Sequence, residues 1–221
     1  MTLAQFLRMK SSIAIFLFVF IAYLIQCCTD KRSSKVLIIG NSITRHGPLP
    51  SEGWYGNWGM AASSEDKDFV NVLMKKIDKD SYNVIIKVAL PSHWERDFNY
   101  DFNGDSMFNF MPDVLIYRLG ENVPDSLAQY AAEIKKLIDR FHAKKVIVSG
   151  TFWPMLFKDS VQAKVAKDNG YEFVDLKDIW GDSKYQAVGQ FKGGGVAAHP
   201  SDSGMVLIAY RLYDKLKIVL Q

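Results

Sequence analysis

The chain has 221 residues, of which 48% are hydrophobic, and a formal net charge of +3 at pH 7. This length suits one globular domain with a substantial core. The small positive excess is spread along the chain without a block of lysines or arginines, so we expect no nucleic-acid partner. The two cysteines, Cys27 and Cys28, are adjacent, which excludes a disulfide framework. No Cys/His cluster has zinc spacing, and we expect neither a metal nor a cofactor.

The N-terminal segment has the pattern of a targeting signal. Arg8 and Lys10 precede the apolar run 13–25, whose 13 residues are short for a membrane span. The run ends at Leu24-Ile25-Gln26-Cys27-Cys28, which resembles a bacterial lipoprotein signal, where a cysteine after a small residue becomes lipidated. Cys28 follows the small Cys27 and is therefore favoured over Cys27. An uncleaved N-terminal anchor is the alternative.

This resemblance implies a division of the chain and a location for the protein. We expect a lipoprotein signal peptide at 1–28, a polar tether at 29–34 and a single folded domain at 35–221. The protein would then be lipid-anchored in the bacterial cell envelope, periplasmic or surface-exposed. Its contact with the membrane would be the lipid, since two or more acyl chains hold a protein stably.

From Lys35 onward, predicted strands alternate with predicted helices. Short apolar runs predict strands at Val36–Ile39, Val84–Ala89, Val114–Tyr117, Val146–Ser149 and Glu172–Val174. Helical periodicity predicts helices near Lys67–Asp78, Ser126–Phe141, Ser160–Asn169 and Ser203–Val219. Strands that alternate with helices indicate a parallel sheet with helices on both faces. The predicted fold class is therefore α/β, a three-layer α/β/α sandwich on a five-stranded parallel sheet.

Ser42 and His199 form the strongest candidate for a chemical site. Ser42 directly follows the first predicted strand, and the carboxyl ends of parallel strands are where such folds bind ligands. His199 lies just before the last predicted helix. A serine and a histidine in these places are typical of a nucleophile and its general base. The alternative is that Ser42 only caps the helix that follows it.

Four separated segments together carry a family resemblance. They are Gly40-Asn41-Ser42, a glycine at Gly59, Gly120-Glu121-Asn122 and His199-Pro200. In this order they resemble the blocks of the SGNH (GDSL-type) hydrolase family over about residues 35 to 219, although that family usually has Gly-Asp-Ser in the first block. A nucleotide-binding α/β domain is disfavoured, because Gly40 stands without a glycine-rich phosphate motif.

The resemblance implies a flavodoxin-like fold and ester hydrolysis through an acyl-serine intermediate. Ser42 would be the nucleophile and His199 its base. The N–H groups of Ser42 and Gly59 and the side-chain amide of Asn122 would form the oxyanion hole. As individual residues, Gly59 and Asn122 are also ordinary turn residues. We expect the substrate to be an ester of a small molecule or carbohydrate, from which acetyl or other short acyl groups are removed.

The histidine block departs from the family at one position. Val196 stands where the family has the aspartate that orients the histidine. Three substitutes are open: a Ser–His dyad oriented by a loop carbonyl, or a relocated acid at Asp202 or Glu121. The rival function is a catalytically impaired SGNH-fold protein that binds carbohydrate.

Several polar and aromatic residues near these blocks are candidate substrate contacts. They are Asn41, His46, Trp58 and Trp94. Three of them have a structural alternative: Asn41 as a turn residue or cap, and the two tryptophans as packing beneath loops.

Overall fold

The computed structural model describes residues 33–80, 82–124 and 129–220. The predicted signal peptide and both cysteines lie outside the described residues, as does the tether up to residue 32. Within the described residues, no helix combines the length and apolarity that a membrane crossing needs.

The central sheet is parallel throughout and has the strand order β2-β1-β3-β4-β5. Its strands are β1 (Ser34–Gly40), β2 (Val84–Ala89), β3 (Val114–Arg118), β4 (Lys145–Ser149) and β5 (Glu172–Val174). This strand order is the flavodoxin-like one. β1 lies inside the sheet, β2 is added on one side of it, and β3, β4 and β5 follow on the other side. The predicted α/β fold and its five strands are confirmed.

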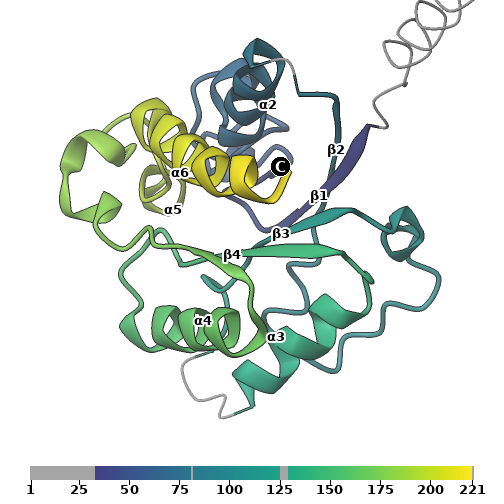
Figure 1. Cartoon of the computed structure of the whole chain (residues 1–221). Helices are drawn as coiled ribbons and strands as arrows, with labels where there is room; N and C mark the ends of the chain where they lie inside the picture. Colours follow the sequence, from purple (N-terminus) through teal and green to yellow (C-terminus); the bar gives the residue numbers. More distant parts are fainter. Residues whose placement is uncertain (1–32, 81, 125–128, 221) are drawn as a thin grey trace, which may run out of the picture. The chain divides into compact units, whose positions relative to one another are not determined.

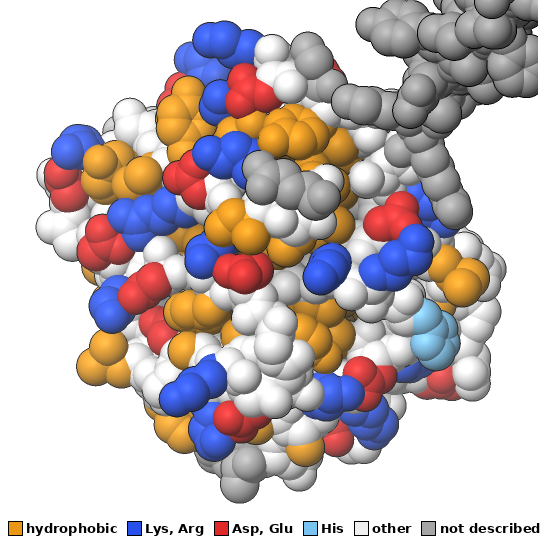
Figure 2. All heavy atoms as spheres, in the orientation of Figure 1, with side chains coloured by type: hydrophobic (Ala, Val, Ile, Leu, Met, Phe, Trp, Pro, Cys, Tyr) orange, Lys and Arg blue, Asp and Glu red, His pale blue; other side chains and the backbone are white. Residues whose placement is uncertain are grey.

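Helices cover both faces of this sheet (Figure 1). The helices α2 (Phe69–Lys79) and α6 (Asp202–Leu220) lie on one face, and α3 (Tyr130–Asp139) and α4 (Leu156–Asn169) lie on the other. Alternate residues of β1 enter the two cores, because successive side chains of a strand point to opposite faces. Val36 and Ile38 pack toward α2 and α6, whereas Leu37 and Ile39 pack toward α3. Basic and acidic side chains are interspersed over the face in Figure 2.

The helix boundaries differ most from the predicted ones at α4 and α3. Helix α4 begins at Leu156, before the expected Ser160. The described part of the helix expected at 126–141 runs from Tyr130 to Asp139. The short helix α5 (Gly194–Ala197) and several 3-10 turns were not predicted, because elements of three to five residues are too short to show periodicity.

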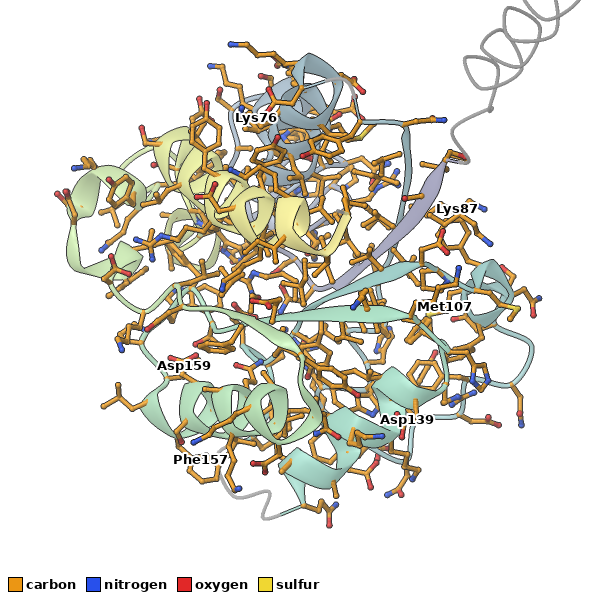
Figure 3. The ribbon with its side chains drawn as sticks, in the orientation of Figure 1. Lys76, Lys87, Met107, Asp139, Phe157 and Asp159 are labelled. Atoms are coloured by element: carbon orange, nitrogen blue, oxygen red, sulfur yellow. The ribbon has the colours of Figure 1, made fainter. Side chains whose placement is uncertain are left out.

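Helix α4 also fixes a loop at the carboxyl end of β4. Figure 3 shows Asp159 on the side of α4 that faces the sheet and Phe157 on the opposite side. The Asp159 carboxylate accepts hydrogen bonds from the backbone N–H of Thr151 at 2.7 Å and from its hydroxyl at 2.8 Å. The loop after β4 is thereby tied to the first turn of α4.

Candidate active site

Ser42 and His199 are brought together from the two ends of the domain. Ser42 Oγ lies 2.9 Å from His199 Nε2. Ser42 sits on the turn directly after β1, and that turn is tight because Gly40 has no side chain: a Cβ there would lie 1.9 Å from Thr44 Oγ1. His199 is buried just before α6, and its ring packs nearly perpendicular to that of Trp153, at a centroid distance of 5.3 Å.

The other ring nitrogen of His199 is oriented by a backbone carbonyl. Its Nδ1 lies 2.8 Å from the Gly195 carbonyl oxygen. At the end of α5 the His199 N–H bonds to the Val196 carbonyl, three residues back, and not to the Gly195 carbonyl, four residues back. A carbonyl only accepts, so Nδ1 carries the proton and Nε2 accepts from the Ser42 hydroxyl. Burial lowers the pKa of His199 below its ordinary value, which favours this neutral base form.

Neither carboxylate considered as an orienting acid contacts His199. Asp202 accepts from the backbone N–H and the hydroxyl of Ser63, both at 2.8 Å, and pairs with Lys67 at 3.0 Å. Glu121 pairs with Arg118 at 2.5 Å and accepts from Phe152 N–H at 3.0 Å. The expectation of a relocated acid at either position is therefore corrected, since both carboxylates are engaged elsewhere. Of the three substitutes, the geometry matches the backbone carbonyl, although Gly195 lies in the short helix α5 and not in a loop as expected.

Gly59 is not placed as an oxyanion donor. Its N–H donates to the Asp68 carboxylate, the N-cap of α2, at 3.2 Å. A Cβ at Gly59 would lie 2.7 Å from the Ile43 carbonyl oxygen, so glycine is required there for close packing. The expected role of Gly59 is corrected accordingly: its N–H is used in holding the start of α2.

A cavity of about 600 Å³ opens over the serine and histidine. Ser42, Ser92, Asn122 and His199 line it, together with His46 and Arg96. Ser92 lies in the loop after β2, and within the described residues its N–H has no acceptor. The Ser42 N–H has none there either. These two N–H groups and the Asn122 amide are thus donors in the vicinity of the nucleophile.

Asn122 is held by two consecutive residues of the loop after β2. Its Nδ2 donates to Glu95 Oε2 at 2.8 Å, and its Oδ1 accepts from Arg96 at 2.9 Å. The backbone N–H of Asn122 also approaches Glu95 Oε1 at 3.3 Å. The predicted oxyanion residue is therefore fixed beside the cavity.

A buried charged network lies beneath the nucleophile. Glu95, Glu121 and Arg118 are all buried, and the Asn41 amide nitrogen bridges the two carboxylates, at 3.2 Å from Glu95 and 2.8 Å from Glu121. Burial and the Glu121 carboxylate raise the pKa of Glu95. For Glu121, burial has the same tendency, but Arg118 and the hydrogen bonds outweigh it and lower its pKa. An aspartate at position 41 would add a third carboxylate, which explains the Gly-Asn-Ser sequence in electrostatic terms.

Of the four candidate substrate contacts, only His46 lines the cavity. Asn41 is buried in the charged network and is 1% exposed. Trp94 is 2% exposed and packs on Phe98 and Tyr117. Trp58 packs edge-on against Trp54 and donates its indole N–H to the Ala62 carbonyl at 2.9 Å. Asn41, Trp58 and Trp94 therefore have structural roles, because their side chains make hydrogen bonds or pack within the domain.

Sequence reasoning missed Glu95, Arg96, Ser92 and the Gly195 carbonyl. Glu95 carries a usable signal, since a carboxylate in the aromatic stretch 94–102 needs partners if it is buried. Arg118, at the end of a buried strand, carries the same kind of signal. The Gly195 carbonyl carries no sequence signal, because every residue has a backbone carbonyl. Among the described residues, no group of three or more His, Cys, Asp or Glu side chains is arranged to hold a metal ion.

No family model and no curated protein matches this sequence. Solved structures do match in fold. An esterase from Pseudoalteromonas sp., inhibited by monoethylphosphonate, is 17% identical with a TM-score of 0.56, over 85% of this chain and 99% of that one. A point mutant of an acetyl-xylooligosaccharide esterase from Geobacillus is 18% identical with a TM-score of 0.58, over 83% and 94%. A Clostridium thermocellum family 3 carbohydrate esterase is 14% identical with a TM-score of 0.60, over 86% and 98%. At these identities the likeness concerns the fold.

Proposed function

We propose that this chain is a serine ester hydrolase of the SGNH type, which removes acetyl or other short acyl groups from carbohydrate. The observation that carries the proposal is the contact of 2.9 Å between Ser42 Oγ and His199 Nε2, with Nδ1 oriented by Gly195. The sequence blocks that contain Ser42, Asn122 and His199 support it, as does the fold shared with esterases. The preference for carbohydrate rests on the neighbours that are named as carbohydrate esterases.

The first half-reaction acylates the serine. His199 Nε2 takes the proton of Ser42 as Oγ attacks the acyl carbon, and the carbonyl oxygen becomes an oxyanion. The N–H groups of Ser42 and Ser92 and the Asn122 amide are the proposed donors to that oxyanion. Loss of one such donor typically costs about 10²–10³ in rate. Collapse of the intermediate breaks the bond to the alcohol, which leaves with the proton from His199.

The second half-reaction repeats this chemistry with water. His199 takes a proton from a water molecule, which attacks the acyl carbon on Ser42, and the acid is released as Oγ regains its proton. In this scheme the Gly195 carbonyl keeps the ring in the required tautomer throughout. A carbonyl contributes a dipole where a carboxylate would contribute a full charge. A Ser–His dyad of this kind would therefore orient the imidazole as a triad does, but it would stabilise the imidazolium less than a triad.

The proposal is tested by labelling and turnover. The purified protein is treated with a fluorophosphonate probe and assayed on p-nitrophenyl acetate and acetylated xylooligosaccharides. We expect labelling and hydrolysis, both of which Ser42→Ala abolishes. Ser203→Ala is the matched control, since Ser203 is exposed at the start of α6 and should change neither.

Two results would overturn the proposal. One is substantial turnover by Ser42→Ala. The other is a wild-type protein that remains unlabelled and inactive across about pH 6 to 9, the range that spans a histidine base. A catalytically impaired protein that binds carbohydrate would then be the proposed function, and oligosaccharide binding would be measured directly.

A further inference from the structure

The Asn122 side chain is held on both of its polar ends by neighbouring residues. Glu95 accepts from its Nδ2 at 2.8 Å, and Arg96 donates to its Oδ1 at 2.9 Å. Arg96 itself is steadied by a hydrogen bond to the Ser92 carbonyl at 3.3 Å. Glu95 approaches from the buried interior, where it is 0% exposed, whereas Arg96 lies at the exposed rim of the cavity.

These two partners permit a single orientation of the amide. A carboxylate only accepts hydrogen bonds and a guanidinium only donates them. If the amide were rotated by half a turn, Oδ1 would face the carboxylate and Nδ2 would face the guanidinium, and both contacts would be lost. One hydrogen of Nδ2 is used by Glu95, and the second has no acceptor among the described residues. That second N–H is the one left for an oxyanion.

Glu95 is suited to this role because it is bound as a carboxylate. Its contacts are all with N–H donors: the backbone of Gly120 at 2.6 Å, the backbone and side chain of Asn122, and the side chain of Asn41 at 3.2 Å. A protonated carboxyl group would need an acceptor, and none of these groups provides one. The same carboxylate therefore contacts the residue before Ser42 and the residue that would bind the oxyanion.

We infer that Glu95 and Arg96 are positioning residues of the hydrolytic site, which clamp the Asn122 amide so that one N–H is preorganised for the acyl oxyanion. This inference rests on the proposed function. Neither residue touches the reacting atoms in this scheme, so both act through Asn122. Preorganised donors contribute more than donors that reorient during the reaction, so loosening the clamp is expected to lower kcat rather than substrate binding.

A double-mutant cycle on p-nitrophenyl acetate hydrolysis tests the clamp. We expect kcat to fall by about 10²–10³ in Asn122→Ala, about 10² in Glu95→Gln and about tenfold in Arg96→Gln, with little change in KM. In the Asn122→Ala background, Glu95→Gln and Arg96→Gln should each cost less than about threefold more. A merely structural role would lower activity in both backgrounds alike. Asp97→Asn is the loop control, since its carboxylate accepts from the neighbouring Asn99 N–H, at 2.9 Å, and contacts neither Asn122 nor Glu95.

The outcomes separate this inference from the proposed function. An inactive and unlabelled wild type overturns the proposed function and the clamp with it. An active wild type in which both clamp variants keep kcat, or in which their losses multiply with that of Asn122→Ala, overturns the clamp alone. Circular dichroism and thermal melting verify that each variant is folded. If the buried Glu95→Gln does not fold, the exposed Arg96→Gln decides through the same cycle.

Discussion

The Nδ1 atom of His199 lies 2.8 Å from the carbonyl oxygen of Gly195, four residues earlier in the chain. Position 196, where the sequence resemblance would place an aspartate, is occupied by Val196, which is 1% exposed. Val196 packs in a small apolar cluster that contains Trp54, Met60 and Ala187. The histidine is thus oriented by the backbone of α5, while the side chain at 196 serves packing. This arrangement determines what substitutions around the histidine should do.

Val196→Asp should destabilise the protein and should not increase turnover. The new carboxylate would be buried among apolar side chains, while the Gly195 carbonyl already occupies Nδ1, and an unpaired buried charge is costly. We expect a loss of at least about 2 kcal/mol in the free energy of unfolding, measured by urea denaturation. Val196→Thr, of similar shape, is the control for size. A rise in kcat of Val196→Asp at unchanged stability would contradict this.

Asp202→Asn should leave ester hydrolysis nearly unchanged. Its carboxylate is used by Ser63 and Lys67 near the start of α6, away from the imidazole. An exposed pair of this kind contributes about 1 kcal/mol or less, so the loss of stability should also be small. Steady-state kinetics on p-nitrophenyl acetate decide the point. A loss of kcat above about tenfold in the folded variant would identify Asp202 as an acid that acts on His199.

Glu121→Gln should destabilise the domain strongly. The Arg118–Glu121 pair has no exposed side-chain surface, and removal of one partner leaves the guanidinium buried without its counter-charge. Breaking such a pair typically costs about 3–5 kcal/mol. Lys164→Gln, which removes the exposed pair with Asp168 on α4, is the control and should cost about 0.5 kcal/mol or less. Equal melting temperatures for the two variants would refute the expectation.

The pH dependence of hydrolysis should report the buried histidine. Burial lowers the pKa of His199 below its ordinary 6.5, more than the Gly195 carbonyl and the Glu121 charge raise it. A base with a lowered pKa stays neutral, and therefore active, to lower pH. The acid limb of kcat/KM should thus have its midpoint below 6.5. Measurement of kcat/KM between about pH 4 and 8 at constant ionic strength gives this midpoint, and a value above 6.5 would be inconsistent with the burial.

Substitution of both cysteines should release the protein from membranes. We propose that Cys28, or else Cys27, is lipidated, on the evidence of the sequence around it. The apolar run 13–25 is short for a span, so the lipid would supply the attachment. The double variant Cys27→Ser/Cys28→Ser is expected in the soluble fraction after expression in a bacterium and fractionation, while Thr29→Ser, the control, stays with the membranes. A processed double variant that still sediments with membranes would point to another anchor.

The sheet and the serine–histidine pair were predictable from sequence for a physical reason. Buried parallel strands such as Val36–Ile39 are short apolar runs that a linear pattern displays directly. A serine after such a strand then falls at the ligand-binding edge of the sheet. The contact between Ser42 and His199 follows from topology, since both lie at positions that the fold brings to that edge.

The second layer of the site was not predictable in the same way. Glu95 contacts Asn41, Gly120 and Asn122, which lie 54, 25 and 27 residues away in the chain. No local pattern encodes such contacts, because they depend on how three loops meet. The role of Gly59 has the same origin: its residue type fits an oxyanion donor, but its N–H donates to Asp68, nine residues later, and no local pattern predicts that contact.

Asn41 has a consequence for how related sequences are recognised. Its amide must donate to Glu95 and Glu121, so the residues at 41, 95 and 121 are expected to change together during evolution. A chain with aspartate at the position of Asn41 would need a hydrogen-bond donor where this one has Glu95. Searches for a Gly-Asp-Ser block treat the asparagine as a defect, whereas here its amide donates to two buried carboxylates, those of Glu95 and Glu121. Joint occurrence of asparagine at position 41 and glutamate at position 95 would therefore mark a distinct subgroup among proteins of this fold.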